Sequence, residues 1–221
     1  MPVLYAEISK VLMPIITSIA QQKRSTHRRS IFLDGVFVFG CNLNVVARFR
    51  LREGLELSME QIEAIQRGEV VQECFDAAIR FLESRLHGRA ELKKKLMRKE
   101  WGESVIEQVL DNLQRLEYLD DVRFAKTKAA SAAKYKHHGR RRAFIELMRA
   151  GISRETADTA LEEVYAQTEI VGIIRQLAEK QATRLKRLEP EVARRRLIGT
   201  LQRRGYEYDD IKPIVDEFFK T

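Results

Sequence analysis

The sequence predicts a mainly α-helical protein of three tandem three-helix (helix-turn-helix-like) repeats in an elongated curved array, preceded by a small N-terminal domain containing a β-hairpin. Three observations predict this fold. A basic segment with one outline recurs, at 88–102, 139–152 and 193–206. From Glu73 onward apolar residues follow a helical period. Before that point the chain is rich in Ile, Val and Phe, which is typical of strands.

The N-terminal domain is expected at 15–70, behind a tail at 1–14. Asp34-Gly35 is a two-residue hairpin signal between apolar runs. It predicts strands near 15–23, 29–33 and 36–40. A short helix is expected to follow at 42–50, with Gly54 ending its connection, and a second helix is expected from an N-cap at Ser58 to a stop at Gly68.

The rest of the chain divides into repeat 1 (71–119), repeat 2 (120–166) and repeat 3 (167–221), each predicted to form three amphipathic helices. Leu96, Leu147 and Leu201 hold equivalent positions in the three middle helices, 51 and then 54 residues apart. The sequence predicts these middle helices at 89–99, 140–150 and 190–204.

Glycine marks the end of two middle helices. Gly151 and Gly205 are placed where a left-handed helix cap is favoured. Repeat 1 has Glu100 at this position and Gly102 two places on. The sequence leaves two alternatives: either the cap of repeat 1 differs, or its helix continues through Trp101.

The charge is segregated by helix. The chain carries net charge +8, with 40 Lys and Arg against 32 Asp and Glu, and its middle helices and their approaches are basic while the third helices are acidic. The basic residues we select as candidate binding residues are Lys93, Lys94, Lys95, Arg98, Lys134, Lys136, Arg140, Arg141, Arg142, Arg149, Arg194, Arg195, Arg196, Arg203 and Arg204. Taken singly, each is better explained as a solvated side chain whose stem covers apolar neighbours. Their threefold recurrence favours a binding surface, a stripe of basic side chains that follows phosphates or an acidic groove. Binding by such a stripe would weaken as salt is added.

No pattern for catalysis, a metal or a cofactor is found. His27, His87, His137 and His138 lack metal-ligand spacing, and no glycine-rich phosphate loop or nucleophile elbow occurs. Asp120 and Asp121 are expected to cap a helix rather than to form a catalytic pair, because adjacent helical residues point to different sides. We therefore predict a protein that is not an enzyme.

Neither a membrane span nor a signal peptide is expected from the sequence. It contains no apolar run of membrane-spanning length, and its first residues lack the basic region of a signal peptide. Cys41 and Cys74 do not have the Cys-x-x-Cys spacing of a metal-binding or redox motif. These features predict a cytoplasmic protein without a membrane partner, and we expect a monomer.

The segment from Tyr118 through Leu119, Asp120, Asp121, Val122, Arg123 and Phe124 to Ala125 resembles the hallmark junction of the RecX family, regulators of the RecA recombinase. The flanking segments GRAELKKKLMRK, VIEQVLDNL and GRRRAFIELMRAGI agree with it. The resemblance covers about 72–219, and the hairpin region resembles the N-terminal extension of some members. Glu100, in place of the usual glycine, and Arg140-Arg141, where a proline is common nearby, depart from the family pattern.

The resemblance implies a curved, all-helical protein that lies in the groove of the RecA–single-stranded DNA filament. It further implies restraint of ATP hydrolysis, strand exchange and coprotease activity, and hence roles in DNA repair, recombination and the SOS response. Arg140–Arg142 and Arg194–Arg196 are the first candidates for contacts with protein or phosphate.

Two other interpretations stay open. One is a sequence-independent DNA-binding helical-repeat protein that contacts single-stranded, and also duplex, DNA through phosphates. The other is a scaffold whose apolar faces serve only to stack. Salt separates them, because a phosphate or filament binder loses affinity in salt and an apolar scaffold hardly responds.

Overall fold

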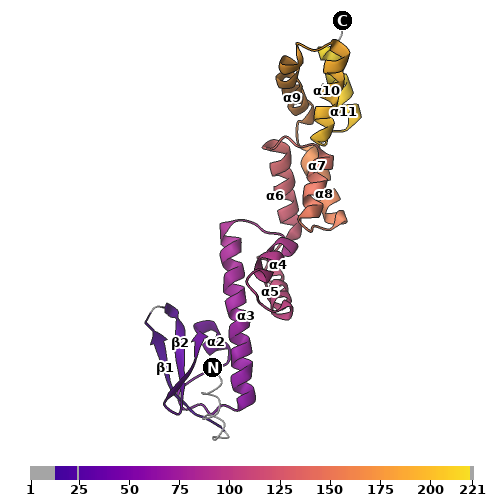
Figure 1. Ribbon diagram of the computed structural model, residues 1–221. Coiled ribbons are helices and arrows are strands. Elements are labelled where there is room, and N and C mark those ends of the chain that lie inside the picture. The colour runs from indigo at the N-terminus through magenta and orange to yellow at the C-terminus, as the bar shows by residue number, and fades with distance from the viewer. Residues whose placement is uncertain (1–12, 24, 220–221) are drawn as a thin grey trace. The chain divides into compact units, whose positions relative to one another are not determined.

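The computed structural model describes residues 13–23 and 25–219 (Figure 1). The chain forms two compact units, which we describe separately. One comprises the chain through Glu83 together with Leu96–Asn112. The other comprises Ser84–Lys95 and the chain from Leu113 onward.

The first unit begins with an antiparallel sheet in the order β1-β2-β3 (Figure 1), made of Ile16–Gln22, Ser25–Leu33 and Val36–Asn42. Asp34 and Gly35 join β2 to β3 with φ of 50° and 83°, and Leu33 pairs with Val36 across the turn. Positive φ at both central residues is the requirement of the type I′ hairpin turn. The hairpin expected from Asp-Gly is therefore confirmed.

Two helices follow the sheet, α2 (Leu43–Arg48) and α3 (Met59–Ser84). Ser58 caps α3 as expected: its Oγ accepts the Gln61 N–H at 3.2 Å, and the Gln61 side chain accepts the Ser58 N–H at 2.8 Å. This reciprocal pair is a capping box.

The predicted stop at Gly68 is wrong, because α3 continues through this residue for 26 residues in all. The absent side chain serves packing instead: a Cβ at Gly68 would lie 2.7 Å from Cε2 of Phe49. The glycine thus lets α3 approach the end of α2 closely, and no left-handed conformation is needed. The domain limits predicted from the sequence stay predictions, and the limit between 70 and 71 falls inside α3.

The sheet and the first half of α3 share a core. It includes Ile16, Ile31 and Leu33 from the strands and Ile62 and Ile65 from α3, all almost fully buried. Buried polar contacts fix the helix to the sheet. Glu69 accepts the N–H of Asn42 at 2.7 Å and pairs with Arg28 at 3.0 Å, while its burial raises the pKa of its carboxyl group.

The remaining helices in the described residues are α4 (Arg89–Met97), α5 (Glu103–Arg115), α6 (Asp121–Lys134), α7 (Arg140–Arg149), α8 (Arg154–Ala166), α9 (Ile170–Leu185), α10 (Pro190–Arg203) and α11 (Tyr208–Phe218). Together with the three-stranded sheet, they confirm the predicted mainly helical fold with tandem three-helix repeats. In repeat 2, α6 packs on α7 and α8, and in repeat 3, α9, α10 and α11 pack on one another (Figure 1).

The equivalent middle-helix leucines Leu96, Leu147 and Leu201 are all fully buried. Gly151 follows α7 with φ of 81°, and Gly205 follows α10 with φ of 90°. Both glycines therefore adopt the left-handed conformation that was predicted for these two helix ends. Glu100 has φ of 65° and thus adopts the same conformation without being glycine. The helix of repeat 1 therefore does not continue through Trp101; α4 ends at Met97.

Candidate partner-binding surface

The ends of two middle helices meet within the second unit. The N–H of Gly139, the N-cap of α7, donates to the carbonyl of Arg204 at 2.8 Å, and the N–H of Arg141 donates to the carbonyl of Gly205 at 3.2 Å. Two carbonyls at and just after the C-cap of α10 thus accept from two amides at the start of α7, and the negative end of one helix dipole faces the positive end of another.

Glycine permits this approach. A Cβ on Gly139 would lie 2.2 Å from the carbonyl carbon of Gly205, and a Cβ on Gly205 would lie 2.4 Å from the backbone nitrogen of Arg142. No side chain fits at such distances. Both positions therefore require glycine for contact between α10 and α7, in addition to the left-handed φ at Gly205.

A similar contact joins the end of α7 to the start of α4. A Cβ on Gly151 would lie 2.3 Å from the Cβ of Ala90. Next to it, the carboxylate of Asp121 accepts the N–H of Arg89, the first residue of α4, at 2.8 Å. Asp121 thus caps a helix of the preceding repeat.

Two further residues of the predicted junction, Asp120 and Phe124, support the helices around it. Asp120 is the N-cap of α6 and accepts the Arg123 N–H at 2.9 Å, which confirms the capping role expected for it. Phe124 is buried in the core of repeat 2, whereas Tyr118 is 56% exposed. The Asp-Asp pair therefore serves two helix ends at once, a role that the sequence alone did not indicate for Asp121.

Several of the candidate basic side chains are engaged within the protein. Arg194 binds Asp216 with N–O distances of 2.7 and 3.1 Å, and Arg140 lies 3.7 Å from Asp158. Lys95 lies 2.7 Å from the ring of His87, and Lys136 lies 2.8 Å from Glu146. Lys93 is half-buried.

Three further arginines contact the backbone or a neighbouring side chain. Arg142 donates to the carbonyl of Arg203, and Arg204 donates to the carbonyls of Lys136 and His137. Arg203 itself reaches the hydroxyl of Thr200 at 3.1 Å. Arg142 and Arg204 therefore help to hold repeats 2 and 3 together.

The remaining candidates are exposed, and in the described part of the chain their side chains make no hydrogen bond or ion pair. We call them the unpaired basic set: Lys94, Arg98, Lys134, Arg141, Arg149, Arg195 and Arg196. Each arginine triplet is thus split by its surroundings, with one unpaired residue in the first and two in the second.

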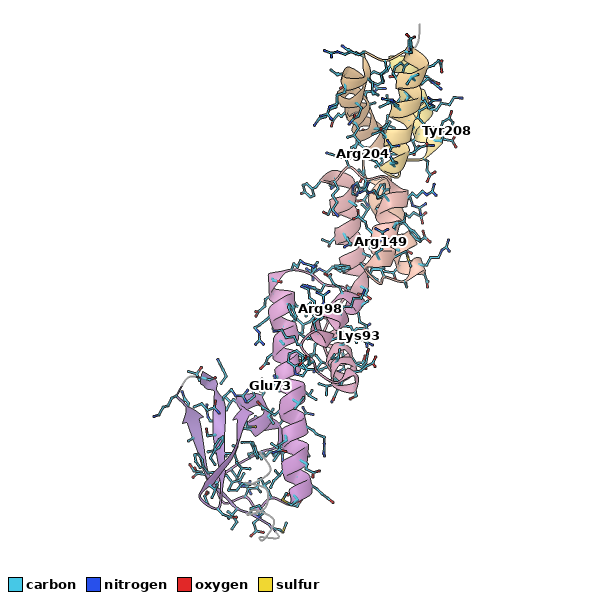
Figure 2. All side chains as sticks on the ribbon, in the orientation of Figure 1. Glu73, Lys93, Arg98, Arg149, Arg204 and Tyr208 are labelled. Carbon is cyan, nitrogen blue, oxygen red and sulfur yellow. The ribbon has the colours of Figure 1, made fainter. Side chains whose placement is uncertain are left out.

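Members of this set recur at equivalent helical positions. Arg98 and Arg149, both labelled in Figure 2, hold equivalent positions in repeats 1 and 2, and Arg203 holds this position in repeat 3. Arg141 and Arg195 are likewise equivalent. After the engaged side chains, Arg203 among them, are set aside, the recurrence persists between repeats 1 and 2 in Arg98 and Arg149, and between repeats 2 and 3 in Arg141 and Arg195.

Exposed apolar side chains accompany these arginines, and sequence reasoning missed them. Met97 is 51% exposed beside Arg98, and Met148 is 38% exposed beside Arg149. Ile145, one turn earlier on α7, is 44% exposed. The Leu-Met-Arg sequence that recurs at 96–98 and 147–149 could have predicted these exposed side chains. In each copy the leucine is buried in the core and the methionine next to it is exposed.

Within residues 13–23 and 25–219, His, Cys, Asp and Glu form no group of three placed to bind a metal ion. No helix in the same ranges is both long and apolar enough to cross a membrane.

The chain matches four family models in order: the regulatory protein RecX N-terminal domain at 14–58, and the first, second and third RecX three-helix domains at 74–113, 120–161 and 168–215. A relative named regulatory protein RecX, from Bacillus velezensis, is 32% identical over 205 residues, which are 93% of this chain and 78% of that protein. The chain belongs to the RecX family.

Other RecX proteins agree with this assignment. That of Bacillus subtilis is also 32% identical, over 93% of this chain and 77% of its own length. A crystal structure of regulatory protein RecX superposes with a TM-score of 0.81 at 24% identity, over 92% of this chain and 99% of that one. The crystal structure of RecX from Lactobacillus salivarius superposes with a TM-score of 0.62 at 23% identity, over 70% of this chain and 99% of that one. These two structures support the fold.

Proposed function

We propose that this RecX-family protein regulates RecA by lying in the groove of the RecA–single-stranded DNA filament. In doing so it inhibits ATP hydrolysis, strand exchange and coprotease activity, as a cytoplasmic monomer without catalytic activity. The observation that carries this proposal is the recurrence of exposed, unpaired arginines at equivalent positions of successive three-helix repeats. A filament is itself a repeating partner, so a repeating surface suits it.

The mechanism we infer is multivalent bridging. Each repeat offers only a few exposed cations, and an exposed ion pair contributes only about 0–1 kcal/mol. Binding by one repeat raises the effective concentration of the next, so several weak contacts yield a strong one. A protein that bridges recombinase protomers would hold them in a relation that slows ATP turnover.

The test is single-stranded-DNA-dependent ATP hydrolysis by the cognate RecA, titrated with this protein well below one per recombinase protomer. Loss of hydrolysis at these ratios would support action on the filament as a unit. Arg141→Glu with Arg195→Glu should weaken inhibition. The matched control is Lys180→Glu with Lys212→Glu, two exposed cations on α9 and α11 that carry the same charge change. Inhibition unchanged by the first pair would remove the unpaired basic set from the mechanism.

The second candidate is sequence-independent binding to DNA itself. The observation favouring it is the same excess of unpaired arginine, which suits phosphates as well as protein carboxylates. In this case ATP hydrolysis would fall only when the protein is sufficient to saturate the DNA, and added competitor DNA would restore it.

A further inference from the structure

Tyr135 is the most exposed of the large apolar and aromatic side chains in the described residues, with 82% of its surface accessible. It is the C-cap residue of α6, at the start of the loop that leads to α7. A side chain so exposed contributes little to the core. Its ring is available to a partner.

Cationic side chains from three segments surround this loop. The guanidinium of Arg204 lies 3.4 Å from the carbonyl of Lys136, and that of Arg142 lies 3.4 Å from the carbonyl of Arg203. Lys134 precedes the tyrosine and has no partner in the described chain. The meeting of α10 with α7 therefore brings cations that are far apart in sequence to the loop that starts at Tyr135; Figure 2 labels Arg204 at this meeting point. We call Lys134, Tyr135, Lys136, Arg142 and Arg204 the Tyr135 cluster.

The acidic side chain in contact with this cluster is Glu146. Its carboxylate lies 2.8 Å from Lys136 and 4.0 Å from Arg142. In the described part of the chain, one carboxylate against four cations leaves the cluster positive. An exposed aromatic ring among cations matches the chemistry of single-stranded nucleic acid, whose bases stack on the ring while its phosphates meet the charges.

We propose that the Tyr135 cluster is a subsite for single-stranded nucleic acid, in which an unpaired base stacks on Tyr135 and the flanking phosphates contact Lys134 and Arg142. The inference deepens the proposed function and rests on it, because it places a direct nucleic-acid contact at the junction of repeats 2 and 3. Duplex DNA does not suit the subsite, since its bases are already stacked.

The junction of repeats 1 and 2 supplies a natural comparison. Tyr118 is also exposed there, at 56%, but its neighbours are Glu117 and Asp120. Carboxylates repel phosphate. Tyr118→Ala is therefore the matched control for Tyr135→Ala: each removes an exposed tyrosine at a repeat junction, and the two sites differ in charge.

The experiment measures binding of the full-length chain to fluorescein-labelled oligothymidylate by anisotropy, without recombinase. Tyr135→Ala should weaken binding by roughly 5- to 150-fold, as loss of one stacked base does elsewhere. Tyr135→Phe and Tyr135→Trp should retain it, because stacking needs the ring and not the hydroxyl group. Tyr118→Ala should leave it unchanged. Circular dichroism verifies that each variant is folded.

Salt and duplex DNA complete the test. Tyr135→Ala should not change the slope of log affinity against log salt, whereas Lys134→Ala should reduce it by about 0.7 if that lysine meets one phosphate. Affinity for duplex DNA should be unaffected by Tyr135→Ala. Equal effects of Tyr135→Ala and Tyr118→Ala, or equal losses in the Phe, Trp and Ala variants, would overturn the proposal. Absence of any oligonucleotide binding would overturn it too, while inhibition of RecA would still be decided by the ATP-hydrolysis assay.

Discussion

At the scale of single residues, Glu100 carries a conformational cost that its counterparts avoid. Its φ of 65° lies in the left-handed region, as do those of Gly151 and Gly205. For a residue with a Cβ, this conformation costs roughly 1–2 kcal/mol. The side chain is exposed and makes no described contact that would offset the cost.

We therefore expect Glu100→Gly to stabilise the protein by about 1 kcal/mol, since glycine's greater freedom in the unfolded chain offsets part of the relief. Urea unfolding followed by circular dichroism measures the change. Glu100→Ala is the control, because it removes the carboxylate but keeps the Cβ. An equal gain in both variants would mean that charge, and not backbone conformation, is the cause.

We expect His87 to make the stability of the protein depend on pH. It is 2% exposed, its Nδ1 donates to the carbonyl of Arg85 at 2.9 Å, and its Nε2 accepts from Lys95 at 2.7 Å. Burial lowers the pKa of this imidazole below its usual 6.5. Because the folded state resists protonation, its contribution to stability is complete above about pH 6.5 and is lost as the pH falls toward the folded pKa.

Lowering the pH from about 7.5 to about 5.5 should therefore reduce the free energy of unfolding, and this reduction should be smaller in His87→Gln, since glutamine does not titrate. His138, whose pKa is also lowered by burial, should supply part of the remainder. Urea midpoints at the two pH values test this. An unchanged pH dependence in His87→Gln would show that His87 does not cause it.

At the scale of elements, the contact of α10 with α7 depends on Gly205, which combines a φ of 90° with close contact to Arg142. We expect Gly205→Ala to destabilise the protein by about 3 kcal/mol, from left-handed strain together with overpacking. Hydrogen exchange should also rise at the amides of Gly139 and Arg141, which donate across this contact.

Gly35→Ala is the matched control, because Gly35 has a φ of 83° but a Cβ added there would meet nothing within 4 Å. It should lose only about 1 kcal/mol and leave exchange at the α7 amides unchanged. A similar loss in both variants would mean that conformation alone makes Gly205 necessary.

The elements themselves could be predicted well from local signals. Asp34-Gly35 placed the hairpin, Ser58 placed the start of α3, and the leucine spacing placed the middle helices, because each depends on neighbours close in sequence. Gly68 misled, since a glycine that ends a helix and a glycine that admits a distant Phe49 look the same in sequence. The contacts of Arg194 with Asp216 and of Arg204 with the carbonyl of Lys136 could not be predicted for a similar reason, because the fold alone brings these residues together; their role in binding stays a prediction.

At the scale of the whole molecule, basic residues are distributed over all three repeats rather than concentrated in one. Repeat 1 has nine basic and nine acidic residues, repeat 2 ten and seven, and repeat 3 twelve and nine. Repeat 1 is therefore neutral overall but still presents Arg98 at the position held by Arg149 and Arg203. Multivalent bridging requires every such position to contribute, whereas a single dominant site requires only one.

Three single reversals, Arg98→Glu, Arg149→Glu and Arg203→Glu, distinguish these cases. Under multivalent bridging each should weaken binding to the RecA–DNA filament by a comparable factor of about 3–10, from loss of one weak contact and some repulsion. The triple variant should approach the product of the three factors, because the sites lie in different repeats and should act independently.

Lys180→Glu, on a first helix rather than a middle helix, is the control for net charge. Apparent affinity measured by inhibition of ATP hydrolysis, at two salt concentrations, provides the comparison. A loss confined to one variant would place binding in one repeat and refute bridging by all three.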